Sequence, residues 1–263
     1  YAITCFVPMW FALLMGAKYL AQQLPACHTA LYYPLCMAVM VLWPMFLWPA
    51  THGMPDAFGL TFAAGIALLC ADYRFETLPW PRLLAIFAAT FALILTRRWY
   101  MFWILAFYAV YVLAVLVGAV RRKTLGSTLK HMLLFGIPSA VIIVGALLPT
   151  FKTILTTDYA DIYGAYYGGG FGNNCLGQLR TQGLVWLVLC AAGLVWLLYC
   201  RSTRAQAIVA AAASLGAMVL FTRTQSLGDH QSLILAPFYL LMLFGPVSYT
   251  HLRAHETKAN LVC

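Results

Sequence analysis

The chain has 263 residues, of which 63% are hydrophobic and 9% are charged, and its formal net charge is +9. Soluble domains carry about 25% charged residues, so this composition excludes an ordinary water-soluble protein. It predicts an all-α, polytopic transmembrane helix bundle, because a helix satisfies its own backbone hydrogen bonds within lipid. We expect membrane lipids as partners and no nucleic acid.

Nine apolar runs follow one another along the chain, and the only charged residue in them is Lys18 near the end of the first. They are residues 2–20, 31–50, 57–71, 83–96, 100–120, 132–150, 183–200, 205–221 and 232–246. A spanning helix needs about 20 apolar residues, so 57–71 and 83–96 are short and are expected to borrow flanking residues or to enter the membrane in part. We expect about nine membrane segments in one domain, residues 1–246, with a long exterior loop at 151–182.

The two ends of the chain carry separate expectations. An apolar run begins at once from Tyr1 without the features of a signal peptide, which predicts an N-terminally truncated fragment. Residues 247–263 are polar and lack apolar periodicity, and the eleven residues VSYTHLRAHET match the translation of a transposase sequencing adapter. We interpret this tail as a read-through artefact rather than a cytoplasmic tail, so its two histidines are not offered as ligands.

Basic residues in short loops predict the orientation, because cytoplasmic loops hold the excess of Lys and Arg. Placing residues 121–131 inside gives nine basic residues inside and five outside. Those inside are Lys18, Arg74, Arg82, Arg121, Arg122, Lys123, Lys130, Arg201 and Arg204, and those outside are Arg97, Arg98, Lys152, Arg180 and Arg223. This orientation brings residues 52–59, 95–102, 156–174 and 222–231 to the exterior face.

The first two exterior segments offer an acid and two cations. Asp56 in GMPD opens an apolar run, where it is expected to act as a hydrogen-bond acceptor or general base, or merely to favour the helix start. Arg97 and Arg98 in RRWY are candidates for a lipid phosphate, because guanidinium groups pair with phosphate oxygens in a bidentate manner. Snorkelling arginines in an aromatic belt are the alternative.

The long exterior loop is rich in tyrosine. Its DYADIYGAYY part has apolar residues at helical spacing, which predicts a short interfacial helix. Asp158, Asp161 and Tyr163 are candidate sugar contacts, since aromatic faces beside carboxylates suit a sugar ring. The same side chains equally suit a membrane interface.

The TRTQSLGDHQ segment is the densest polar cluster, and it lies between two apolar runs. His230 is a candidate catalytic residue because histidine titrates near neutrality, and Asp229 is expected to orient it. Arg223 and Gln225 are expected to contact substrate. The alternative is a turn held by an ion pair between Arg223 and Asp229, although exposed ion pairs contribute little to the free energy of folding.

These segments resemble a known family in loosely matching motifs and in hydropathy layout. The motifs are GMPDAFGL at 53–60, RRWY at 97–100, DYADIYGAY at 158–166 and RTQSLGDHQ at 223–231. The arrangement is similar to the GT-C class of polytopic glycosyltransferases, namely the bacterial family 39 and ArnT-like enzymes. The resemblance implies inverting transfer of a sugar from a polyprenyl-phosphate donor to an acceptor on the outer face of the inner membrane.

The resemblance also has a gap. The family normally carries its catalytic acid in a first large exterior loop, which this chain lacks, so the missing N-terminus is expected to contain it. Asp56, Asp229 and His230 then remain as candidate catalytic residues. No cofactor is implied and no metal ligand is assigned, because no Cys or His spacing indicates a metal site, although a divalent metal is left open.

Three other functions stay open. A glycan polymerase or ligase would use lipid-diphosphate donors, a flippase or transporter would need polar residues along the spans, and a scaffold would scatter its polar residues. The interiors of the nine runs hold no Asp, Glu, Arg or His, which counts against ion-coupled transport. The enzymatic hypothesis fails if Asp56, Arg97, Arg223 and His230 lie more than about 20 Å apart, beyond a substrate-sized pocket.

Overall fold

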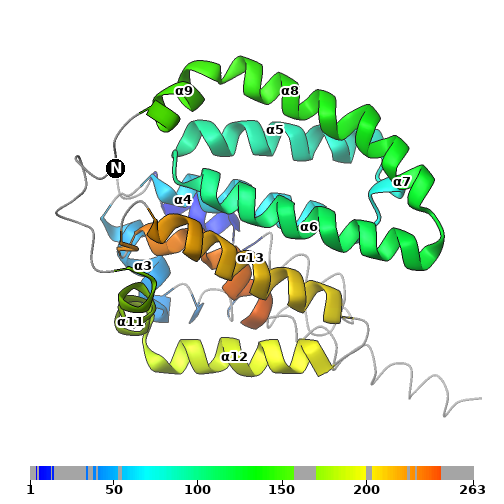
Figure 1. Ribbon diagram of the computed structural model, residues 1–263. Coiled ribbons are helices and arrows are strands. Elements are labelled where there is room, and N and C mark those ends of the chain that lie inside the picture. The colour runs from blue at the N-terminus through cyan, green and yellow to red at the C-terminus, as the bar shows by residue number, and fades with distance from the viewer. Residues whose placement is uncertain are drawn as a thin grey trace, which may run out of the picture.

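The computed structural model of the protein describes residues 4, 6–12, 14, 34, 38–39, 41–52, 55–156, 170–199, 203–223, 226–228 and 230–243. Every regular element in these ranges is helical and none is a strand, so the expected all-α class is confirmed there (Figure 1). Residues 247–263 and parts of the first two apolar runs lie outside the described residues.

The helices follow one another with short connections. The first half of the chain contains α3 (Pro44–Thr51), α4 (Asp56–Leu69), the short helix η2 (Phe75–Thr77), α5 (Trp80–Thr96) and α6 (Tyr100–Arg122). The second half contains α7 (Leu125–His131), the π-helix η3 (Met132–Gly136), α8 (Ile137–Ala146), α9 (Leu148–Thr156), α11 (Gly170–Gln182), α12 (Leu184–Tyr199), α13 (Arg204–Thr222) and η5 (Gln231–Ile234).

α4, α5 and α6 run up and down beside one another. The start of α5 is fastened to the end of α4, because Arg82 Nε donates to the Leu69 carbonyl at 2.7 Å. α5 then ends at Thr96, and three residues reverse the chain before α6 begins at Tyr100. The start of α4, the end of α5 and the start of α6 therefore meet at one end of the bundle.

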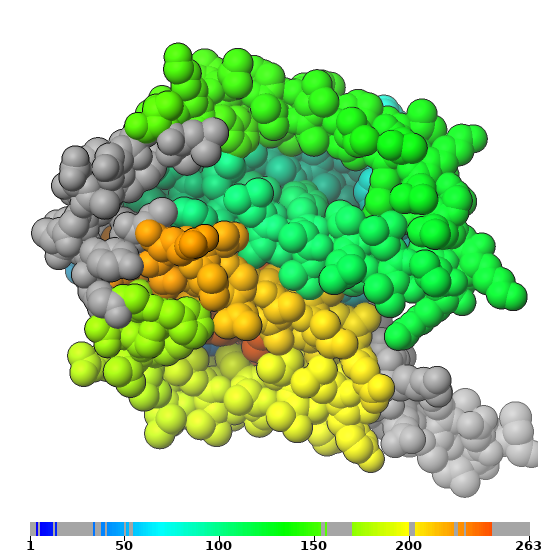
Figure 2. Space-filling view, viewed as in Figure 1, coloured from blue at the N-terminus to red at the C-terminus, as the bar shows by residue number. Residues whose placement is uncertain are grey.

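α6 and α13 form the most extensive helix pair, and they are antiparallel. Phe102 near the start of α6 packs edge-on against Phe221 at the end of α13, with ring centroids 5.5 Å apart. Small residues allow the close approach: a Cβ at Gly216 would lie 3.3 Å from the Ala106 Cβ. Figure 2 shows α13 between α6 and α12, so this pair forms the centre of the molecule.

The expectation of about nine membrane segments is wrong for the described part of the chain. Three helices there are long and apolar enough to cross a membrane, namely Tyr100–Arg122, Leu125–Ala146 and Arg204–Thr222, or four if α11 and α12 form one broken span. Apolar runs reveal composition but not where a helix ends. α4 has 14 residues and is about 21 Å long at 1.5 Å per residue, short of a core of about 30 Å.

Two further runs differ from expectation. Residues 232–246 begin as the short helix η5 and continue as a helix over residues 236–243, so they form no long span in the described part. The 151–182 segment is not a continuous loop, because α9 extends to Thr156 and α11 occupies Gly170–Gln182. The interfacial helix expected around residues 159–166 lies outside the described residues.

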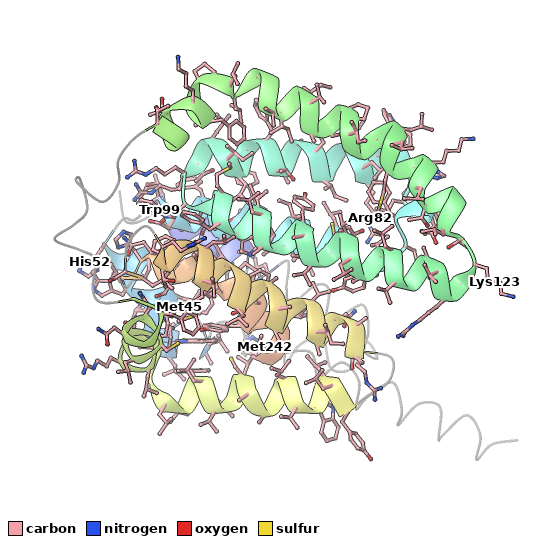
Figure 3. All side chains as sticks on the ribbon, in the orientation of Figure 1. Met45, His52, Arg82, Trp99, Lys123 and Met242 are labelled. Atoms are coloured by element: carbon pink, nitrogen blue, oxygen red, sulfur yellow. The ribbon has the colours of Figure 1, made fainter. Side chains whose placement is uncertain are left out.

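The polar helix ends gather in two separate places. Figure 3 shows Trp99 and His52 at one end of the bundle and Arg82 and Lys123 at the other. This separation agrees with the predicted topology, which assigns residues 52–59 and 95–102 to one side of the membrane and Arg82 and Lys123 to the other. Which end faces the exterior stays a prediction.

The end that carries Arg82 and Lys123 is closed by a cluster around Glu76. The Glu76 carboxylate is 8% exposed and accepts hydrogen bonds from Arg122 at 3.1 Å, Thr124 at 3.1 Å and Thr128 at 3.0 Å. Burial by itself would raise the pKa of Glu76, but these hydrogen bonds and one from its backbone lower that pKa below its ordinary value. The cluster ties the α4–α5 connection to α6 and α7.

We expect Glu76→Gln to weaken the fall in stability at acidic pH. A carboxyl group whose pKa is lowered by folding stabilises the native state above its ordinary pKa, and that stability is lost as the pH falls through the folded pKa. The wild-type melting temperature in detergent should therefore drop below about pH 4.5, the ordinary value, and the variant should be less stable at pH 7 with a flatter profile. Equal slopes for both proteins would contradict the cluster's role.

We expect Gly59→Ala to destabilise the protein by about 1–3 kcal/mol, the usual cost of overpacking. A Cβ at Gly59 would overlap the ring of Tyr100, which packs against α4 at this point. Gly65→Ala on the same helix is the matched control, since a Cβ there meets nothing within 4 Å, and the better helix propensity of alanine should leave it neutral or up to about 1 kcal/mol more stable. Thermal unfolding in detergent separates the two variants.

Candidate functional site

A buried carboxylate lies at the end of the bundle where α4, α5 and α6 meet. Asp56 is 0% exposed, and both of its oxygens are occupied. Trp99 Nε1 donates to Oδ1 at 2.7 Å, and Arg97 Nη2 donates to Oδ2 at 3.3 Å. A buried charge is costly without partners, so these two contacts fix the turn between α5 and α6 against the start of α4.

The local sequence explains why this carboxylate sits at the start of α4. Asp56 is the first residue of the helix, where the positive end of the helix dipole favours an acid. The Asp56 carbonyl also accepts a hydrogen bond from the Tyr100 hydroxyl at 2.8 Å. The same residue is therefore held through its side chain and through its backbone.

The turn itself combines two cations with one aromatic ring. The Arg97 guanidinium lies 4.5 Å from the centroid of the Trp99 ring, and that of Arg98 lies 5.7 Å away. Both distances are within the range of cation–π attraction. The Tyr100 amide donates to the Arg97 carbonyl at 3.1 Å, so the turn is closed tightly and keeps both arginines beside the ring.

A cavity of about 340 Å³ opens beside this turn. Its lining residues come from the end of α5, the turn and the α9 helix, and they are Ile94, Leu95, Thr96, Arg97, Arg98, Trp99 and Thr150. The two guanidinium groups and the Thr150 hydroxyl are donors of the kind that an anion such as phosphate prefers. The remaining lining is apolar, so the cavity suits an anionic head group attached to a hydrocarbon chain.

His230 packs against Trp99 as well. Its ring centroid lies 6.0 Å from that of Trp99 and 6.3 Å from that of Trp48, and Trp48 stacks in turn on His52 at 4.4 Å. The imidazole is half-buried rather than sealed in. Trp99 thus joins His230 to Asp56 and Arg97 in one cluster.

A row of buried amides on α11 holds the segment that carries His230. Asn174, Gln178 and Gln182 recur every four residues and so share one face of the helix. Asn174 Oδ1 accepts from the Leu227 amide at 2.6 Å, and Gln178 Nε2 donates to Ser232 Oγ at 2.8 Å. Both sides of His230 are therefore anchored to α11.

The amide row continues to a core tryptophan. Gln182 Nε2 donates to Gln178 Oε1 at 3.3 Å, and Gln182 Oε1 accepts from Trp43 Nε1 at 2.9 Å. Sequence reasoning treated this stretch as loop and missed the row. The spacing N174-x₃-Q178-x₃-Q182 was the available signal, since buried amides at helical spacing indicate a hydrogen-bonded helix face.

The predicted site residues have different outcomes. Asp56, Arg97 and His230 come together around Trp99, and Arg98 borders the cavity. Arg223 is exposed at the end of α13, and no ion pair joins its side chain to another described residue. Gln225, Asp229, Asp158, Asp161 and Tyr163 lie outside the described residues, and their roles stay predictions.

No group of three His, Cys, Asp or Glu side chains within the described ranges could hold a metal ion. The chain matches no family model, no curated protein and no solved structure. The likeness to GT-C enzymes therefore stays a prediction.

We expect Trp99→Phe to lower stability by about 1–3 kcal/mol, because it leaves Asp56 Oδ1 buried without a donor. Asp56→Asn should cost a similar amount, since it removes the charge that pairs with Arg97. The matched control is Trp80→Phe on α5, where the side chain is 54% exposed and the same change should cost less than about 0.5 kcal/mol. Equal melting temperatures for the Trp99 and Trp80 variants would contradict the buried cluster.

Proposed function

We propose that this protein is a membrane glycosyltransferase that transfers a sugar from a polyprenyl-phosphate donor to an acceptor at the outer face of a bacterial inner membrane. One observation carries the proposal: a three-residue turn at the end of the bundle presents two guanidinium groups to a cavity and is locked in place by a buried carboxylate. This combination suits a phosphate that must be held at the membrane boundary.

The position of the cavity supports a lipid-linked anion over a soluble one. Its wall includes Ile94 and Leu95 from the apolar helix α5, along which a polyprenyl chain could extend toward the bilayer. The phosphate would then meet Arg97 and Arg98, which lie just beyond the last turn of that helix. Arginine is suited to this task because its planar fork matches two phosphate oxygens.

The proposed reaction uses the arginines to stabilise the leaving group. A general base removes the proton of the acceptor hydroxyl, the acceptor oxygen attacks the anomeric carbon, and the bond from that carbon to the phosphate oxygen breaks with its electron pair. Polyprenyl phosphate leaves with one additional negative charge, and the configuration inverts. Fixed cations beside the developing charge lower the barrier to such a step.

His230 fits the role of base better than Asp56 does. The Asp56 carboxylate is fully buried, and its two oxygens already accept hydrogen bonds, so we assign it to holding Arg97 and Trp99. The half-buried imidazole of His230 lies beside the same tryptophan, and a neutral imidazole nitrogen can accept a proton as a general base. Asp229 would orient the His230 ring. The alternative general base is a carboxylate that lies outside the described residues.

We expect Arg98→Gln to weaken binding of polyprenyl phosphate to the protein in lipid nanodiscs about tenfold or more, because a hydrogen bond to a charged group contributes about 1.5–3 kcal/mol. Lys130→Gln is the control, because it removes the same charge from an exposed position on α7, the helix at the opposite end of the bundle (Figure 1). Equal affinities for the two variants would exclude the phosphate site.

The transfer step is tested with a polyprenyl-phosphate sugar and a hydroxyl acceptor. His230→Ala should reduce sugar transfer by about 10²–10⁴-fold while polyprenyl phosphate still binds. A wild-type protein that binds the lipid but moves it between leaflets, without releasing the sugar, would instead identify a flippase. Turnover of a lipid-diphosphate donor alone would identify a polymerase or ligase.

A further inference from the structure

α11 presents three chemically different sides. The side facing the bundle carries the buried amides of Asn174, Gln178 and Gln182. Successive residues of a helix are about 100° apart, which places Cys175, Leu176 and Leu179 together on a second side. Asn173 and Arg180 share the third.

The two outward sides differ in polarity. Leu176 is 55% exposed, Leu179 is 40% exposed, and the Cys175 thiol is also exposed, so one outward side is apolar. Asn173 and Arg180 are exposed as well. Because the amide hydrogen bonds fix the rotation of the helix, the apolar side cannot turn inward without breaking them.

The direction of α11 differs from that of the candidate spans. It is bent by 106° from α12 at Gly183, whose φ of +81° is in the region that favours glycine. In Figure 1, α12 runs in the plane of the picture while α11 is seen end-on at the end of the bundle. If α12 lies along the membrane normal, α11 lies close to the membrane plane.

The apolar side of α11 is followed along the chain by exposed apolar residues at the start of α12. Leu184 is 65% exposed and Val185 is 69% exposed, directly after the bend. Exposed apolar side chains are therefore present on both sides of the bend. Arg180 adds charge complementarity to phosphate head groups, in a chain of net charge +9.

We propose that α11 is an interfacial helix embedded in the head-group boundary of the bilayer. Cys175, Leu176 and Leu179 contact acyl chains, whereas Asn173 and Arg180 face head groups and water. Helices of this kind bury an apolar side by about 5–10 Å at the boundary between head groups and acyl chains. The proposal is independent of sugar transfer, since it concerns only how the helix that holds the His230 segment meets the lipid.

The wild-type protein provides the first test. It is reconstituted in phosphatidylcholine and phosphatidylglycerol vesicles that contain a phospholipid with a photoactivated diazirine near the top of its acyl chain. Irradiation should attach lipid to the peptide that holds Leu176 and Leu179. Absence of lipid from this peptide, while a peptide of α6 is labelled in the same sample, would overturn the proposal.

The second test measures depth on two sides of the same helix. In one variant Cys175 is the only cysteine and carries a fluorophore; in the matched variant Cys175→Ala is combined with Asn173→Cys. Phospholipids with a nitroxide high on the acyl chain should quench the Cys175 label several-fold more than the label at position 173, and aqueous iodide should show the opposite order.

The outcomes separate lipid from other coverings. Strong quenching of both labels by iodide would mean that α11 lies in water, and protection of the Cys175 label from both quenchers would mean that protein covers it. Either result overturns the proposal. If removing the other cysteines prevents folding, the photolabelling result decides alone, because it needs no substitution.

Discussion

The burial of one carboxylate at the start of α4 is the constraint on which this end of the molecule depends. Asp56 has no access to water, so its charge is tolerated only with donors that are themselves fixed. Trp99 and Arg97 meet that requirement, and both belong to the turn that joins α5 to α6. The position of the turn, the shape of the cavity and the direction of the arginines therefore follow from a single electrostatic requirement.

Much of the helical framework could be predicted from composition and periodicity. The runs at 100–120 and 205–221 correspond closely to α6 and α13. A long apolar stretch without proline is expected to form a membrane-spanning helix. The shorter runs were misjudged because composition does not locate bends. Gly183 divides a polar helix from an apolar one, and only the backbone conformation reveals that the two differ in direction.

The candidate site was predictable in its members but not in their roles. The polarity of GMPD, RRWY and the His230 segment singled out residues that the fold does bring together. Burial was not predictable, however, because it depends on neighbours distant in sequence. The GMPD segment indicated that Asp56 could be a general base, yet Asp56 is enclosed by residues 41 to 44 positions away. The amides of α11 were missed for the related reason that polar residues suggest a loop until their partners are known.

Two charge clusters, one at each end of the bundle, fix the ends of α4, α5 and α6 relative to one another. Glu76 with Arg122 secures one end, and Asp56 with Arg97 secures the other. The run that begins at α7 is held far less firmly, since only 6% of the apolar stretch in Leu125–Ala146 is buried against 39% in α6. Thr150, which follows this run, forms one wall of the cavity. The cavity thus lies between a turn that the Asp56 cluster fixes and a helix that follows this sparsely buried run.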